Sequence, residues 1–121
     1  MSLDANTALT AYSRNAIEPA ASTIYAFGAF TLLPRRRILL KSGERVELGD
    51  RALDLLTILV ERAGDVVGKT ELMARAWPDV FVDDISLRVN ISALRRALGD
   101  DRKDQIFIRN VVGRGYCFVE N

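Results

Sequence analysis

The chain has 121 residues, of which 49% are hydrophobic and 27% charged; these are values for one globular domain, and its net charge of +1 does not by itself indicate a nucleic-acid ligand. The single cysteine, Cys117, excludes an internal disulfide and a cysteine-based zinc site, and the absence of histidine excludes histidine metal sites and Ser–His triads. No apolar run approaches the roughly 18 residues of a membrane span and no signal peptide is recognisable, so we expect a cytoplasmic protein without a membrane partner.

The N-terminal segment differs in composition from the rest of the chain. Residues 1–23 are rich in Ala, Ser and Asn with weak periodicity, so we expect a flexible tail or linker before a folded domain at residues 24–121. From Ile24 the sequence becomes aromatic and β-branched, with "IYAFGAFTLL", "RRRILL" and "RVEL" separated by turn-forming residues. This pattern predicts three or four short antiparallel strands.

Two helices are predicted next. In "GDRALDLLTILVERAG" the apolar residues recur at helical spacing, with Gly49 as N-cap and Gly64 as the C′ residue. One face of this helix carries Ala52, Leu56, Leu59, Val60 and Ala63. After the strand-like "DVV", the second helix, "GKTELMARAWP", has Gly68 as N-cap and ends at Pro78. Its buried face is expected to carry Leu72, Met73 and Ala76.

The loop "PDVFVDD" leads to a third helix, at about residues 84–98, in "DISLRVNISALRRALGD". Asp83 or Asp84 is the expected N-cap and Gly99 the end. This capping role explains the clustered aspartates better than a metal site does. A narrow apolar stripe, expected to pack on the core, consists of Leu87, Ile91, Leu94 and Leu98.

The opposite face of the third helix is basic and otherwise small or apolar. Between Ile85 and Leu98 there are three arginines and no acidic residue, whereas a solvated helix normally mixes both signs. This composition suits a DNA major groove, with Arg88, Arg95 and Arg96 reaching phosphates and Asn90 able to pair with adenine. A partly buried helix with arginines exposed for solubility is the alternative.

Two further features carry weaker signals. The cluster Arg35–Arg37 is expected to be solvated. Trp77, at the end of the second helix, is either a core anchor, which we favour, or an indole donor to a phosphate.

Near the C-terminus, "VVGRGYCFV" predicts a β-hairpin formed by "IFIRNVV" and "YCFVE". Gly113 and Gly115 allow a tight turn from which Arg114 projects, and a narrow minor groove attracts an inserted arginine. Arg109 and Asn110 lie on the incoming strand, while Tyr116 and Phe118 are expected to face inward and Cys117 outward.

The order of strands, two helices, a turn, a third helix and a hairpin is that of an α+β winged helix-turn-helix. The chain resembles the OmpR/PhoB-type winged-helix transcriptional regulators from about Tyr25 to Val119. The matching pieces are "FGAFTLLPRRRILL", "VELGDRALDLLTILVERAGDVVGKTELMARAWPD", "DDISLRVNISALRRALGD" and "IRNVVGRGYCFV". The resemblance implies an N-terminal antiparallel four-stranded sheet, three helices and a C-terminal β-hairpin wing. It also implies double-stranded DNA as ligand, tandem head-to-tail assembly on DNA, and a loop, Trp77 to Asp84, that can touch RNA polymerase.

The resemblance also assigns positions one by one. Trp77 and Arg95 match phosphate-contacting places, and the base-facing places are taken by Ser86, Val89, Asn90 and Ala93. Some members have arginine where Ala93 and Val112 stand here, and Arg114 is a candidate replacement for the latter. The target sequence therefore cannot be transferred from a relative.

The leading interpretation is sequence-specific double-stranded DNA binding in transcription regulation, with the third helix in the major groove and Arg114 toward the minor groove. The alternative is a winged-helix protein–protein interaction module. No constellation supports an enzyme, and no cofactor is expected. The chain has no room for a receiver domain, and "GRGY" and "RALDLLTILVERAG" are more similar to relatives that place the winged helix at the N-terminus of a longer regulator, so we expect a domain excerpt.

Overall fold

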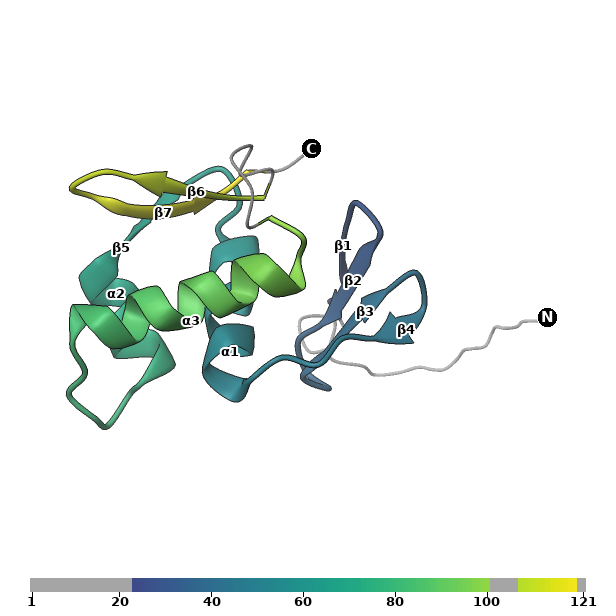
Figure 1. The fold of residues 1–121 in the computed structure, drawn as a ribbon, viewed down its shortest axis with the longest axis horizontal. Helices are drawn as coiled ribbons and strands as arrows, with labels where there is room; N and C mark the ends of the chain where they lie inside the picture. The colour runs from purple at the N-terminus through teal and green to yellow at the C-terminus, as the bar shows by residue number, and fades with distance from the viewer. Residues whose placement is uncertain (1–22, 101–106, 120–121) are drawn as a thin grey trace.

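A computed structural model describes residues 23–100 and 107–119. The helices lie in the middle of the molecule, with the N-terminal sheet at one end and the sheet that contains the C-terminal hairpin along another side (Figure 1). The predicted tail or linker, apart from Thr23, lies outside the described residues. Among the described segments, no helix is long and apolar enough to cross a membrane.

An N-terminal antiparallel sheet forms one end of the molecule. Its strands follow chain order: β1 (Tyr25–Phe27), β2 (Phe30–Leu33), β3 (Ile38–Lys41) and β4 (Glu44–Arg45). The four-stranded sheet is therefore confirmed. In the β2–β3 turn, Arg37 donates a hydrogen bond of 2.7 Å to Oδ1 of Asp54. All three arginines of the cluster are exposed, as predicted, and the Arg37 side chain in addition links the sheet to the first helix.

The first helix, α1 (Asp50–Glu61), occupies the centre of the fold. It begins after Gly49, as predicted. Its C-cap is Arg62, so the C′ residue is Ala63, and Gly64, the predicted C′ residue, lies one position further on. Ile58, which lies outside the predicted buried face of α1, is also buried. The reason is that α2, α3 and β7 all pack against α1, so more than one of its faces is covered. The second helix, α2 (Lys69–Ala76), has Gly68 as N-cap and Trp77 as C-cap.

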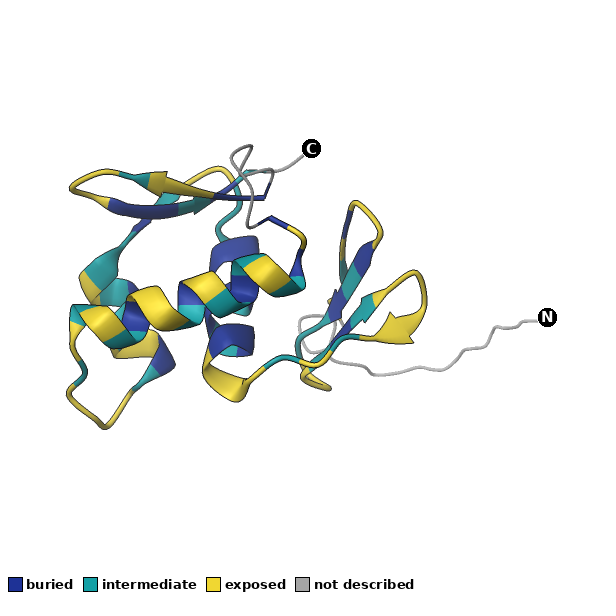
Figure 2. Ribbon diagram, in the orientation of Figure 1, coloured by how far each residue is buried: buried dark blue, intermediate teal, exposed yellow. Residues whose placement is uncertain are grey.

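The third helix, α3 (Asp84–Ala97), has the predicted caps. The Asp83 carboxylate accepts a 3.0 Å hydrogen bond from the Ser86 backbone N–H, and Gly99 follows the C-cap Leu98 with a φ of 71°. All four residues of the predicted apolar stripe are buried: Leu87, Ile91, Leu94 and Leu98. Figure 2 shows buried and exposed residues alternating along α3, so one face packs on the core and the other is open.

The wing is the hairpin β6 (Ile108–Val111) and β7 (Gly115–Phe118) with the loop 112–114. The hairpin is confirmed, but β5 (Val66–Gly68) also pairs with β7, giving the strand order β5-β7-β6. The sequence identified "DVV" only as a strand-like linker. Tyr116 and Phe118 are buried and Cys117 is half-buried, as the predicted alternation requires.

Four phenylalanines join the two sheets. Phe27 and Phe30 of the N-terminal sheet lie against Phe107 and Phe118 at the base of the wing, with the Phe27 and Phe118 ring centroids 5.0 Å apart. Edge-to-face contacts of this kind are favourable. The N-terminal sheet therefore supports the end of the wing opposite to its tip.

Gly115 is required where β7 meets β5. A Cβ atom at this position would lie 2.9 Å from the Cα of Gly68 and closer still to the carbonyl oxygen of Val67. We expect Gly115→Ala to lower the free energy of unfolding by at least about 2 kcal/mol, measured by urea denaturation. Gly113→Ala is the control, because its φ is also positive but nothing surrounds its Cβ, and it should cost about 1 kcal/mol. Equal losses would contradict this account.

The cap of α3 should make stability depend on pH. The hydrogen bond from the Ser86 backbone N–H holds the pKa of Asp83 below its usual value. Its stabilisation is therefore complete above the unfolded-state pKa of about 3.9 and is lost as pH falls through the lower folded-state pKa. Unfolding measured from pH 7 to pH 2 should show Asp83→Ala less stable than wild type at neutral pH, with a gap that closes in acid. Asp79→Ala, in the same loop, should show no such gap, and a gap independent of pH would rule out the charged cap.

Candidate nucleic-acid interface

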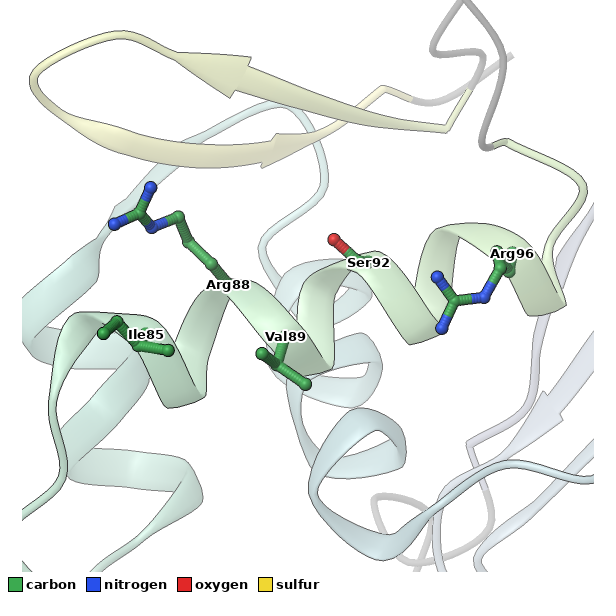
Figure 3. Close-up of a pocket in the computed structure, with 5 residues that line it drawn as sticks. All are labelled: Ile85, Arg88, Val89, Ser92 and Arg96. Atoms are coloured by element: carbon green, nitrogen blue, oxygen red, sulfur yellow. The ribbon is translucent and has the colours of Figure 1, made fainter.

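The outward face of α3 presents a shallow, open groove (Figure 3). It is lined by Ile85, Arg88, Val89, Ser92 and Arg96. Ile85 and Val89 are 62% and 60% exposed although both are apolar. The apolar stripe of α3 packs on the core, so the opposite face of the helix, which carries Ile85 and Val89, must point to solvent. The surface is basic and apolar at once.

The arginines at the two ends of this groove differ in their partners. Nε of Arg88 lies 3.2 Å from Oδ2 of Asp84, whose other oxygen is 3.8 Å from Nζ of Lys69. Arg88 remains 63% exposed despite this pair, and Figure 3 shows its side chain extending toward the wing. Arg96 is exposed and has no ion-pair partner within the described part of the chain. Both guanidinium groups can reach an anionic ligand.

The four predicted base-facing residues do not share one environment. Val89 is exposed, whereas Ser86, Asn90 and Ala93 are half-buried. The Asn90 side-chain Nδ2 donates a 2.9 Å hydrogen bond to the Ser86 backbone carbonyl, which leaves its amide oxygen as an acceptor. Of the four, Val89 is the most exposed, so it is the most accessible to a ligand that lies on α3.

Arg95 and Trp77 are both turned toward the protein. Nη2 of Arg95 donates a 2.9 Å hydrogen bond to the Ile108 carbonyl, and its guanidinium carbon lies 6.0 Å from the Tyr116 ring centroid. Burial of the ring raises the pKa of the Tyr116 hydroxyl, although Arg95 acts in the opposite direction. Trp77 packs against the core, as the favoured interpretation predicts, and its phosphate contact stays a prediction.

The wing presents further exposed basic and polar residues. Arg109 and Asn110 on β6 and Arg114 in the tip loop are all exposed. The Arg114 backbone N–H donates to the Val111 carbonyl at 2.9 Å, which closes the turn, and Val112 in that turn is 87% exposed. In Figure 1 the tip of the wing lies at the end of the molecule where α3 begins. The tip of the wing and the first turn of α3 thus lie at the same end of the molecule.

Sequence reasoning missed several features of this surface. Ile85 and Ser92 line the groove but were not selected as site residues, although their place on the helix opposite the apolar stripe was the available signal. Pairing of Arg88 with Asp84 was detectable from their i,i+4 spacing. The contact between Arg95 and Ile108 has no local signal in the sequence.

The fold and this surface match known proteins. The family described as "Transcriptional regulatory protein, C terminal" matches residues 43–118. The transcriptional regulator HilA of Salmonella typhimurium is 35% identical over 100 residues, which are 83% of this chain and 18% of HilA. The chain thus spans less than a fifth of the length of that relative.

Solved structures give the same result. The Klebsiella pneumoniae RstA DNA-binding domain, solved in complex with the RstA box, has a TM-score of 0.70 and 32% identity over 79% of this chain and 96% of its own. The DNA-binding domain of Escherichia coli CpxR has a TM-score of 0.71 and 31% identity over 82% of this chain and 98% of its own. The chain therefore belongs to the OmpR/PhoB-type family of winged-helix DNA-binding domains of transcriptional regulators, which is a DNA-binding and not an enzymatic class of domain.

Proposed function

We propose that this domain regulates transcription by sequence-specific binding of double-stranded DNA, with α3 in the major groove and Arg114 directed toward the adjacent minor groove. The observation that carries the proposal is the exposed face of α3. From Ile85 to Arg96 its exposed side chains are neutral or basic. The wing, which α3 contacts through Arg95, adds the exposed Arg109, Asn110 and Arg114. The structurally similar RstA domain was solved with its DNA box, which supports DNA as the ligand class.

Base contacts are proposed for Ser86, Val89, Asn90 and Ala93. The exposed methyl groups of Val89 fit the 5-methyl group of thymine, and the Asn90 amide oxygen can accept from an exocyclic amine. The small side chains of Ser86 and Ala93 let the helix backbone approach the bases.

Phosphate contacts are proposed for Arg88 and Arg96 on α3 and for Trp77 at the end of α2. Arg88 and Arg96 supply charge, and the indole N–H of Trp77 can donate a neutral hydrogen bond. On the wing, Arg109 and Asn110 follow the backbone while Arg114 enters the minor groove. Arg95 was predicted to contact phosphate as well, but its hydrogen bond to the wing favours the different role argued below.

The loop between α2 and α3 is proposed to contact RNA polymerase. Phe81 is 96% exposed and Val80 is 61% exposed, beside a depression that also includes Met73 and Trp77. Exposed large apolar groups of this kind often mark a protein-binding surface. The same observation favours the second candidate function, a protein-interaction module, in which this loop acts without DNA binding. Tandem head-to-tail assembly on DNA is a further proposal.

Selection from random duplexes, followed by titration of the enriched duplex at several salt concentrations, distinguishes the two functions. DNA binding predicts an enriched motif and an affinity that falls steeply with salt. We expect Arg88→Gln and Arg96→Gln each to flatten the slope of log K against log salt by about 0.9 and to weaken binding to all sequences. Arg36→Gln, an exposed arginine in the β2–β3 turn, is the matched control and should leave the slope unchanged. No binding at low salt would instead favour the protein-interaction module.

The wing makes a separate prediction. Arg114→Ala should weaken binding by about five- to 100-fold at sites whose flank is A/T-rich, because a narrow minor groove concentrates negative potential, and by less at G/C-rich flanks. Titration of both duplexes with both proteins measures the difference. An equal loss on both would make Arg114 a phosphate contact, and no loss would remove it from the interface.

A further inference from the structure

We propose that Arg95 is a positioning residue that holds the wing in place beside α3, so that the contribution of Arg114 to DNA affinity depends on Arg95. This inference rests on the proposed function, since it assigns how the wing is presented to DNA. It gives Arg95 a different role from its exposed neighbour Arg96, although the two arginines are adjacent on the same helix.

One side chain of α3 contacts both strands of the wing. Nη2 of Arg95 bonds to the carbonyl of Ile108, the first residue of β6, and the guanidinium lies against the ring of Tyr116 in β7. These are contacts to the base and middle of the hairpin rather than to its tip. A planar, rigid guanidinium can satisfy a carbonyl and an aromatic face together.

A second set of hydrogen bonds, made by Asp100, also holds the wing at Ile108. The carboxylate of Asp100, which is 1% exposed, accepts hydrogen bonds of 3.1 Å and 2.8 Å from the backbone N–H groups of Phe107 and Ile108. The Asp100 backbone N–H in turn donates to the Arg95 carbonyl at 2.7 Å. Both backbone groups of Ile108 are thus bonded to residues in the last turn of α3 or just after it.

These bonds leave Arg95 poorly placed to contact DNA directly. The residue is only partly exposed, and its Nε atom is buried with no hydrogen-bond partner among the described residues. Turning the side chain outward onto a phosphate would break its bond to Ile108. Holding the hairpin base instead restricts where its tip can lie, and a preordered tip loses less conformational entropy when DNA binds.

A double-mutant cycle on the enriched duplex tests the inference. The dissociation constant is measured for wild type, Arg95→Met, Arg114→Ala and the double variant; methionine keeps much of the length of the arginine while removing its charge and donors. Positioning predicts that Arg95→Met weakens binding by about the factor that Arg114→Ala does, and that the double variant is no more than about twofold weaker than Arg114→Ala.

Arg96→Met is the matched control. Its effect should multiply with that of Arg114→Ala, because an independent phosphate contact adds its free energy. Amide hydrogen exchange supplies a second readout: β6 and β7 should exchange faster in Arg95→Met, while α1 should not. If Arg95→Met does not fold, Arg95→Gln replaces it in the cycle.

Each other outcome overturns the inference and identifies what failed. If the effects of Arg95→Met and Arg114→Ala multiply, Arg95 contacts DNA by itself and the proposed function stands without the inference. If Arg114→Ala has no effect while Arg95→Met weakens binding, the wing contributes nothing for Arg95 to position. If neither variant changes binding, both the proposed contact of Arg114 with DNA and the proposed positioning role of Arg95 are wrong.

Discussion

Burial of one stripe of α3 is the constraint on which the rest of the interface depends. Leu87, Ile91 and Leu94 are at most 2% exposed and face α1. A helix that is packed on the core along one face cannot turn about its axis. Its fixed orientation exposes Ile85, Val89 and Arg96. The surface offered to DNA is therefore a consequence of hydrophobic packing, and a polar residue in the stripe would disturb the outer face without touching it.

The wing is tied to this helix and to the N-terminal sheet by different kinds of contact. Its base rests on the phenylalanine cluster, whose contacts are apolar. The hydrogen bonds of Asp100 and Arg95 to Ile108 are directional and set the orientation of the hairpin. From that supported base the chain runs outward to Arg114, so the N-terminal sheet serves the interface although none of its residues lines the groove.

The sequence predicted those parts that local patterns determine. The apolar stripe and the cap of α3 follow from spacing within one helix, and the wing follows from Gly113 and Gly115 between β-branched and aromatic residues. Pairing of β5 with β7 joins segments almost fifty residues apart, which periodicity cannot detect. The orientation of Arg95 was missed for the same reason, since its partner Ile108 lies 13 residues further along the chain. A helical spacing gives the face of a residue, but its bonding partners depend on tertiary packing.

Methylation of bound DNA by dimethyl sulfate tests the central claim most directly, because the reagent attacks guanine N7 in the major groove and adenine N3 in the minor groove. The account predicts protection of guanine N7 where α3 lies and of adenine N3 at the neighbouring minor groove, with only the second protection lost in Arg114→Ala. Unprotected guanine N7 throughout a bound, enriched duplex would contradict the placement of α3 in the major groove.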